Sequence, residues 1–445
     1  MGKPVVSDKG GLWATWTRGT LPGAGQWTHQ YGDPGNTASS TDTALKCPLG
    51  VLWYGEPGPN KVPSRHLGNA APLTINGRVY LQGINRIMCF DAYNGLPYWE
   101  REVPGAYRVG MVYEASNIAC DDQSLFVVTG KQCLRLSAQT GATMRTYDLP
   151  PTTGEGEPKW AWIAVVGNTL YGSVSRKGQE SDTIFALDAG KGTVRWTFTG
   201  GRIRNNTICL SEGRMFFADA TVTAAQRVEA LQAKIQEIME QGKISAAEAE
   251  KQLTSADVRL VTALDAATGK RLWQRPVDLT DCGPHVLIAI ATRGVVVFCG
   301  AHSDGHYWPQ FLAGEYGARR ATVLSAQDGS LLWTKAIGYR IRPLVVGDEL
   351  IAEPWSFDLK TGQQKMRTHP LTGLASPWQF ERPGHHCGCI AGSPNGLYFR
   401  SWSLGYYDRL RDNGTQHFGG QRPGCWINMI PANGLLVMPE ASSGC

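Results

Sequence analysis

The sequence has 445 residues, 42% of them hydrophobic, and its 53 glycines, 25 prolines and 15 tryptophans are typical of many short strands joined by turns. The 43 basic and 38 acidic side chains leave a net charge of +5 without a Lys/Arg run, which argues against a nucleic-acid partner. No apolar run is long enough to span a membrane, and the first ten residues lack the layout of a secretory signal.

One pattern recurs along the chain: an Asp after an apolar strand, a Gly four residues later and a Trp four residues after that. An Asp-x-x-x-Gly turn joins antiparallel strands, because Asp bonds the amides of its own turn and Gly takes a positive φ. We expect the Trp to pack between neighbouring sheets. Complete copies are FDAYNGLPYW (90–99), LDAGKGTVRW (187–196) and LDAATGKRLW (264–273); weaker copies are LSAQTGATM (136–144), LSAQDGSLLW (324–333), FDLKTGQQKM (357–366) and YYDRLRDNGTQ (406–416).

Each copy follows a short apolar segment that we interpret as the innermost strand of its sheet. The period is about 45 to 50 residues, as in four-stranded propeller blades, apart from one longer gap. Residues 221–257 fill that gap with apolar side chains at helical spacing, and Ser245 with Glu248 resembles a capping box, so we expect an inserted helical hairpin. The inner-strand segments are 71–75, 116–120, 162–166, 206–210, 287–291, 343–346, 388–392 and 427–438.

These repeats predict an all-β, eight-bladed propeller of four-stranded antiparallel blades over residues 45–445, preceded by an N-terminal arm, residues 1–44. The last segment, 427–438, has no complete second half before Cys445. The orphan strand VLWYGEP (51–57) is expected to supply an outer strand there, so that both ends of the chain share one blade and the ring closes without an exposed edge.

The repeats resemble the PQQ-like, or quinoprotein-type, β-propeller superfamily, and LDAATGKRLW (264–273) is close to its blade signature. The resemblance implies a propeller that is either a quinone-dependent alcohol dehydrogenase or a non-catalytic scaffold, like the outer-membrane assembly lipoprotein. Residues 384–389, 417–428 and 438–445 also resemble poorly characterised bacterial PQQ-like repeat proteins, which implies a periplasmic or extracellular location. The chain lacks the adjacent Cys-Cys pair of the dehydrogenases, so a binding scaffold is favoured over an enzyme.

Residues just before the inner strands are expected to converge at the mouth of the central channel. Several guanidiniums in a low-dielectric funnel would bind an anionic small molecule, a glycan or an acidic protein surface. In the alternative, each Arg tethers carbonyls of adjacent blades or faces solvent. PQQ with calcium is the alternative ligand, because PQQ is itself a tricarboxylate. The predicted mouth residues are Arg65, His66, Arg108, Trp160, Arg204, His285, Arg342, His386, Arg422 and Trp426.

The cysteines fall into two groups. Cys89, Cys120, Cys133, Cys209 and Cys299 lie in apolar strands and are interpreted as buried hydrophobic residues. A disulfide is predicted among the loop cysteines, with free thiols or a metal site that includes His385 and His417 as alternatives, although the spacing fits no standard metal motif. The disulfide candidates are Cys387, Cys389, Cys425 and Cys445.

A last candidate is the segment AHSDGHYW (301–308), whose His302, Asp304 and His306 alternate and could line a site with Glu315. A decorated loop is the alternative. Phosphate-binding loops, nucleophile elbows and metalloprotease motifs are absent from the sequence.

Overall fold

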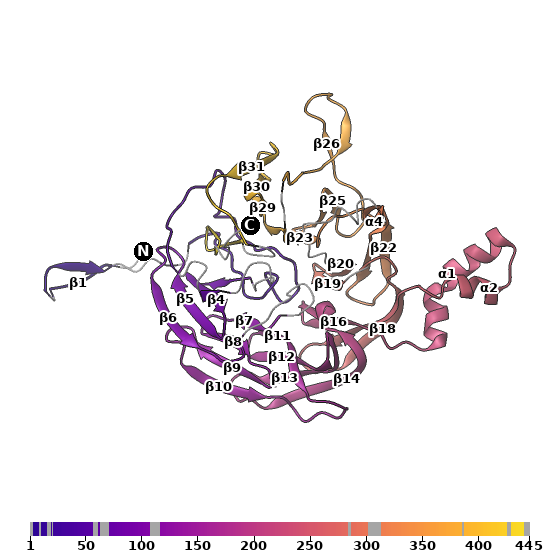
Figure 1. The fold of residues 1–445 in the computed structure, drawn as a ribbon, viewed down its shortest axis with the longest axis horizontal. Coiled ribbons are helices and arrows are strands. Elements are labelled where there is room, and N and C mark those ends of the chain that lie inside the picture. The colour runs from indigo at the N-terminus through magenta and orange to yellow at the C-terminus, as the bar shows by residue number, and fades with distance from the viewer. Residues whose placement is uncertain are drawn as a thin grey trace.

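Antiparallel sheets stand radially around a common centre, like the blades of a propeller (Figure 1). The computed structural model describes residues 3–8, 10–15, 19, 21–56, 61–62, 71–106, 116–283, 286–300, 313–384, 387–424 and 429–439. The predicted all-β class with four-stranded antiparallel sheets is confirmed.

The strands follow one another from the centre of the ring to its rim in the first half of the chain. The first two sheets are β3 (Leu73–Ile75), β4 (Arg78–Gly83), β5 (Arg86–Asp91) and β6 (Pro97–Glu102), then β7 (Ile118–Cys120), β8 (Ser124–Val128), β9 (Gln132–Ser137) and β10 (Thr143–Asp148). The next two, joined into one sheet through β14 and β16, are β11 (Lys159–Val166), β12 (Thr169–Lys177), β13 (Glu180–Asp188) and β14 (Val194–Arg204), then β15 (Cys209–Ser211), β16 (Arg214–Asp219), β17 (Val258–Asp265) and β18 (Arg271–Asp278).

The second half repeats this order with fewer strands in two of the sheets. The radial sheets of this half are β19 (Leu287–Thr292), β20 (Val295–Gly300), β21 (Arg320–Ser325) and β22 (Leu331–Ala336); β23 (Leu344–Val346), β24 (Glu349–Ala352) and β25 (Trp355–Asp358); β28 (Ala391–Ser393), β29 (Gly396–Ser401), β30 (Ser403–Asp408) and β31 (Thr415–Phe418); and β32 (Ile430–Ala432) with β33 (Leu435–Val437). Short helices η3 (Asn205–Thr207) and α4 (Glu315–Ala318) lie between strands.

The predicted turns form as expected between third and fourth strands. Asp91 Oδ1 accepts hydrogen bonds from the amides of Tyr93 and Asn94 at 2.7 and 3.2 Å, and Gly95 takes φ +73°. The distorted copy has Asp412 at the glycine position, where it takes φ +50°, a conformation that Asp tolerates better than most residues. The local chemistry of the repeat therefore determines the hairpins.

The repeat tryptophans join several neighbouring sheets through the same type of hydrogen bond. Trp99 Nε1 donates to the carbonyl of Ala138 at 3.0 Å, and Trp196 makes the same bond to Ala266. The second sheet has no Trp at this position, and Tyr147 donates its hydroxyl to Ala189 instead. Equivalent bonds from Trp273 and Trp333 reach Ala326 and Leu359.

Residues 51–56 do not form the strand that the sequence predicts, because they have no ladder partner among the described residues. Trp53 nevertheless docks like the other tryptophans: its Nε1 donates to the carbonyl of Ala92 at 2.8 Å, and its ring lies against Gly95. The segment therefore packs on the turn between β5 and β6 without the backbone pairing of a strand.

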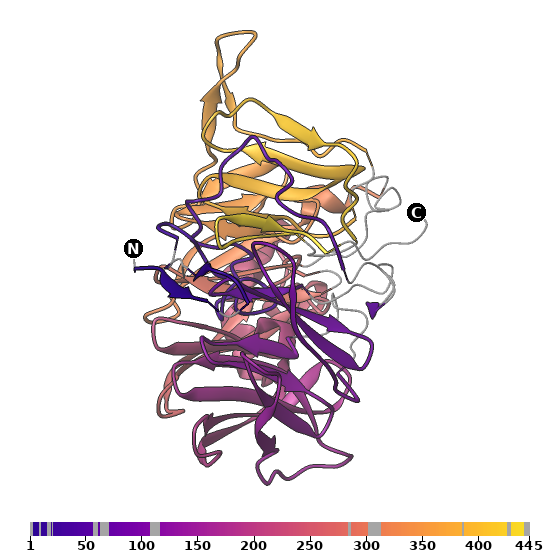
Figure 2. The ribbon, with the colours of Figure 1, turned by 90° about the vertical axis from the view of Figure 1, so that its left-hand side faces the viewer.

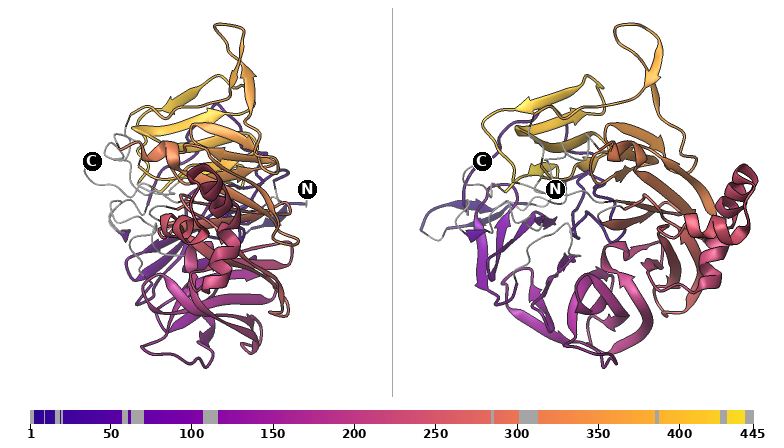
Figure 3. Two further views of the ribbon diagram at one scale, coloured as in Figure 1. Left: turned by 90° about the vertical axis from the view of Figure 1, so that its right-hand side faces the viewer. Right: turned by 45° about the vertical axis from the view of Figure 1, so that its right-hand side comes forward.

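Three hairpins project from the propeller. The predicted helical hairpin is confirmed as α1 (Ala224–Gly242) and α2 (Ala246–Gln252), and the Ser245–Glu248 capping box forms (Figures 1 and 3). The hairpin of β26 (Met366–Thr368) and β27 (Ala375–Pro377) extends beyond the rim (Figure 2). The hairpin of β1 (Val5–Ser7) and β2 (Trp13–Thr15) extends from the other side (Figure 1).

The core lies between and within the sheets. The five strand cysteines are buried, with exposed fractions of at most 2%, as predicted. No helix in the described part of the chain combines the length and the apolar character that a membrane crossing requires.

Candidate functional site

Residues 27–42, which we call the channel segment, run inside the ring and contact the inner strands in chain order. A backbone pair links Trp27 to β3, and the last contacts reach β32. The intermediate contacts are His29 with Ala119 and Val165, Pro34 with Leu210, Gly35 with Ala291, Thr37 with Val345, and Ser39 with Gly392. The part of the N-terminal region predicted to be an arm therefore lies in the channel itself.

Arg342 is held by the channel segment. Its side chain is 1% exposed, its Nη2 donates to the carbonyl of Asn36 at 2.6 Å, and its guanidinium lies 4.1 Å from the centre of the Tyr31 ring. Burial raises the pKa of the nearby Asp33 carboxyl, while hydrogen bonds from Thr37 and the charge of Arg342 oppose that shift. The cation predicted to bind an external anion is thus buried and hydrogen-bonded to backbone carbonyls within the chain.

A fully buried ion pair lies between the sheets. Arg382 Nε and Nη2 donate to the two carboxylate oxygens of Glu353 at 2.9 and 2.5 Å, and both side chains are 0% exposed. Arg382 also donates to the carbonyl of Gly388 at 3.1 Å. This bidentate geometry connects the segment after β24 to the segment before β28.

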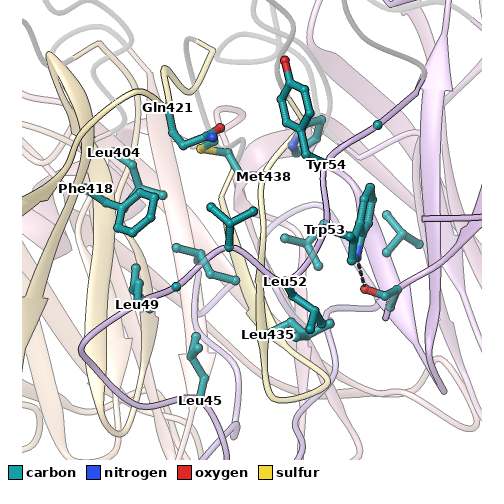
Figure 4. A pocket seen from close by; sticks show the side chains of 18 of the residues that line it. Leu45, Leu49, Leu52, Trp53, Tyr54, Leu404, Phe418, Gln421, Leu435 and Met438 are labelled. Atoms are coloured by element: carbon teal, nitrogen blue, oxygen red, sulfur yellow. Dashed lines mark hydrogen bonds between the residues drawn. The ribbon is translucent and has the colours of Figure 1, made fainter. Parts of the chain in front are cut away.

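A cavity of about 340 Å³ opens beside β33 (Figure 4). One wall is the segment 45–56, including Leu52 and Trp53, and another is β33 with Met438. Leu404 and Phe418 of the preceding sheet face it from the other side. Most of the lining side chains are apolar, but Lys46, Glu56 and Gln421 also line the cavity, so it could take a ligand with both apolar and polar groups.

The repeats match a model of a known protein family. A family model described as outer membrane protein assembly factor BamB matches residues 135–368, more than half of the chain. The chain belongs to the PQQ-like repeat family. No curated protein matches its sequence.

Solved structures resemble this PQQ-like repeat chain at low identity. They include BamB from Moraxella catarrhalis (14% identity, covering 74% of this chain and 79% of that chain, TM-score 0.38). The computationally designed Ika8 protein covers 87% of this chain and 98% of its own at 11% identity, with a TM-score of 0.50, which shows the fold alone. A quinohemoprotein alcohol dehydrogenase from Comamonas testosteroni is 13% identical, covering 92% of this chain and 75% of its own, with a TM-score of 0.49.

Two described members of the predicted mouth, Trp160 and Arg204, contact residues of their own sheet. Trp160 is 3% exposed and packs edge-on against Phe185 at 4.9 Å between ring centres. Arg204 forms an ion pair with Glu180 at 3.4 Å, and Arg422 is half-buried. The other predicted mouth residues lie outside the described residues: Arg65, His66, Arg108, His285, His386 and Trp426.

The disulfide prediction is wrong for the cysteines that the structure describes. No disulfide joins any two of them, and Cys389 is a free thiol with 3% exposure, whose pKa burial raises to about 12. Cys387 is buried as well, while Cys425 and Cys445 lie outside the described residues. An apolar site can bury a neutral thiol, which the loop-like sequence around these residues did not indicate.

The described part of the channel does not fit PQQ with calcium. The channel segment lies against the inner strands, and Arg342 donates a hydrogen bond to its backbone. Within the described residues, no group of three or more His, Cys, Asp and Glu side chains is placed to hold a metal ion. The further candidates His302, Asp304 and His306 lie outside these residues, as does the side chain of Glu315.

His29 makes the channel segment sensitive to pH. The amide of Val165 donates to His29 Nε2 at 3.1 Å, so the ring proton is on Nδ1, which donates to Thr28 Oγ1 at 2.8 Å. Burial lowers the pKa of His29 to about 3 from an ordinary 6.5. Below pH 6.5 the unfolded chain gains a proton that the folded chain does not, so the stability from this residue is lost as the pH falls from 6.5 toward 3.

We therefore expect the native chain to lose about 2 kcal/mol more than His29→Gln in free energy of unfolding between pH 7 and pH 5, by urea denaturation. His369→Gln, in the projecting β26–β27 hairpin, is the matched control and should keep the native pH dependence. Equal pH dependence in the native chain and His29→Gln would contradict a neutral, buried His29.

Proposed function

We propose that this chain is a non-catalytic scaffold that binds other proteins outside the cytoplasm, in the assembly of outer-membrane proteins. The observation that carries the proposal is the match of residues 135–368 to the assembly-factor family model. The channel segment supports it, because the centre of the ring is used for the chain's own contacts. Partners would then bind on the rim or on the faces of the sheets.

We further propose that the ring has eight blades and closes between β33 and β3, through residues 51–54. The channel segment contacts eight inner strands in succession, from β3 to β32. The bond from Trp53 to Ala92 repeats the contact that Trp99 makes with Ala138 one sheet further on. Closure of this kind removes the exposed sheet edges that favour aggregation.

Site-specific photo-cross-linking in the cells that produce the protein tests the scaffold proposal. A photoreactive residue at Leu436, beside the cavity, or at Leu272, on the rim strand β18, should capture envelope proteins at defined positions. A probe at Gln236 on α1 serves as a comparison on a helix outside the ring. Capture confined to cytoplasmic proteins would contradict the proposal.

Cofactor retention tests the enzymatic alternative. We expect the purified chain, incubated with PQQ and calcium and then desalted, to show no quinone absorbance and no dye reduction with alcohols, because the described channel does not fit the cofactor. Stoichiometric retention with turnover would replace the scaffold proposal by an oxidoreductase.

A further inference from the structure

The hairpin of β26 and β27 is an insertion in the fourth strand of its sheet. The repeat spacing places a Trp eight residues after Asp358, but Met366 stands there and Trp378 follows twelve residues later. Gln364 before the insertion and Gln379 after it both pair with β25. The chain therefore leaves the fourth strand at Met366 and resumes it at Trp378.

Trp378 makes the contacts of a repeat tryptophan in spite of the insertion. Its Nε1 donates to Asp412 Oδ1 at 3.0 Å, and its ring packs edge-on against that of Tyr407 in the next sheet, with 5.4 Å between ring centres. The hairpin is thus not needed to join the two sheets. It extends beyond the rim in two perpendicular views (Figures 1 and 2). A role for the hairpin must therefore be sought in its exposed side chains.

The tip of the hairpin repeats the turn of the ring with leucines at two exposed positions. His369 takes the place of the repeat Asp, and Gly373 takes that of the repeat Gly, with φ +71°. Leu371 and Leu374 stand where the turn that begins at Asp358 has a Lys and a Gln. Their exposed fractions are 89% and 69%. Two such leucines at the end of a projecting hairpin favour contact with an apolar phase or surface.

The backbone amides of the tip all have acceptors within the turn. The amides of Leu371 and Thr372 donate to His369 Nδ1 at 3.3 and 3.2 Å, and the amide of Gly373 donates to the carbonyl of His369 at 2.9 Å. The amide of His369 donates to the carbonyl of Leu374 at 2.8 Å. The amide of Leu374 donates to Thr372 Oγ1 at 3.4 Å, and the remaining residue of the turn is a proline. A partner strand would need free amides, whereas a lipid phase accepts a turn that satisfies its own.

The charge of the hairpin also suits a lipid surface. Residues 359–380 include Lys and Arg side chains but no Asp or Glu, so no acidic group on this segment is repelled by anionic headgroups. At the base, Lys365 pairs with Glu349 at 2.9 Å. Arg367 lies 3.7 Å from Asp412. These cations are therefore largely neutralised, and the leucines must provide most of the affinity.

We propose that the β26–β27 hairpin inserts its leucine tip into the surface of a phospholipid bilayer and holds the propeller there with its rim toward the lipid. Residues 366–371 can extend at most about 16 Å, at about 3.3 Å per residue. This reach covers the depth of about 5 to 10 Å at which interfacial segments lie. Both faces of the ring would stay open to partners. The inference goes beyond the proposed scaffold function and does not depend on it.

Co-sedimentation of the full chain with vesicles of phosphatidylethanolamine and phosphatidylglycerol tests the proposal. We expect the double variant Leu371→Asp, Leu374→Asp to bind at least tenfold more weakly than the native chain, because it removes the apolar side chains that enter the bilayer. The matched control is Leu96→Asp, Leu331→Asp, which changes the charge equally at leucines that are 64% and 57% exposed on the ring. Leu96 has the turn position in the first sheet that Leu374 has at the tip. The control should bind like the native chain, and added salt should weaken native binding less than about threefold.

Deletion of residues 366–377 gives a second variant. It places Trp378 eight residues after Asp358, which is the spacing of the complete repeats. We expect this variant to keep the native circular dichroism spectrum and to bind vesicles at least tenfold more weakly. In the full-length chain, a photoreactive residue in place of Leu371 should cross-link to phospholipid, and one in place of Leu331 should not.

A native chain that does not bind vesicles would overturn the proposal, as would leucine-tip or deletion variants that bind equally well. Binding that salt abolishes and the leucine substitutions leave unchanged would have the same consequence. Self-association of the native chain in sedimentation velocity, lost in Leu371→Asp, Leu374→Asp and unaffected by vesicles, would show that the tip binds a second copy instead of lipid. Vesicle binding with no envelope protein captured in cells would leave the lipid site standing and remove the assembly role.

Discussion

Arg382→Ala is expected to lower the free energy of unfolding by about 3 to 5 kcal/mol, because it leaves the carboxylate of Glu353 buried without its charge partner. Both side chains are 0% exposed, and the guanidinium also donates to the carbonyl of Gly388. Solvent cannot replace either interaction at this depth. Urea denaturation at pH 7 measures the loss.

The matched control is Arg340→Ala. Arg340 makes a similar bidentate pair with Glu381, but the two side chains are 31% and 53% exposed, so we expect less than about 1 kcal/mol. Replacing Arg382 and Glu353 together with leucine should recover most of the loss, since no buried charge remains unpaired. A small effect of Arg382→Ala alone would show that water reaches Glu353.

The repeat turns could be predicted from the sequence because their chemistry is local. An Asp at one position and a Gly four residues later determine a hairpin through contacts within six residues, as Asp91 and Gly95 do. The substitutions that obscured two repeats are explained by geometry. Asp412 adopts the positive φ usually left to glycine, and Tyr147 reaches the carbonyl that a Trp elsewhere would reach.

The candidate site could not be predicted in the same way, because its contacts are long-range and largely made by backbone atoms. The amide of Ala291 donates to Gly35, and a Cβ at Gly35 would lie 2.2 Å from the Ala291 carbonyl. No periodicity in residues 27–42 predicts that this segment runs along the inner strands. Arg342 was identified as a cation near the channel, but the sequence does not show whether its guanidinium faces solvent or the chain.

The last repeat is an intermediate case. The sequence predicts that the last repeat is incomplete and that residues 51–57 contribute an outer strand to it. In the structure Trp53 donates to Ala92 of the first sheet, and residues 51–56 form no strand. The difference arises because a docking Trp needs only one hydrogen bond and a flat contact with Gly95, whereas a strand needs a paired neighbour. The third strand that would be this neighbour is not among the described residues.

Asp42→Ala is expected to lower the free energy of unfolding by about 4 kcal/mol or more, because it removes one acceptor from several buried amides at once. Asp42 is 0% exposed. Its Oδ2 accepts from Gly25 and Gly434 at 2.8 and 2.7 Å, and its Oδ1 accepts from Ala44 and Leu45 at 3.0 and 2.8 Å. One carboxylate thus ties the end of the channel segment to the β32–β33 turn.

Asp42→Asn tests whether both carboxylate oxygens are needed. The amide keeps one acceptor oxygen but presents an NH₂ group to the other pair of backbone amides. We expect it to lose roughly as much as Asp42→Ala, or slightly less, in urea denaturation. The control is Asp358→Ala, an exposed turn Asp that accepts from Lys360 and Thr361 and should cost about 1 kcal/mol. If Asp42→Ala is no worse than Asp358→Ala, the four buried hydrogen bonds of Asp42 contribute no more to stability than those of an exposed turn Asp.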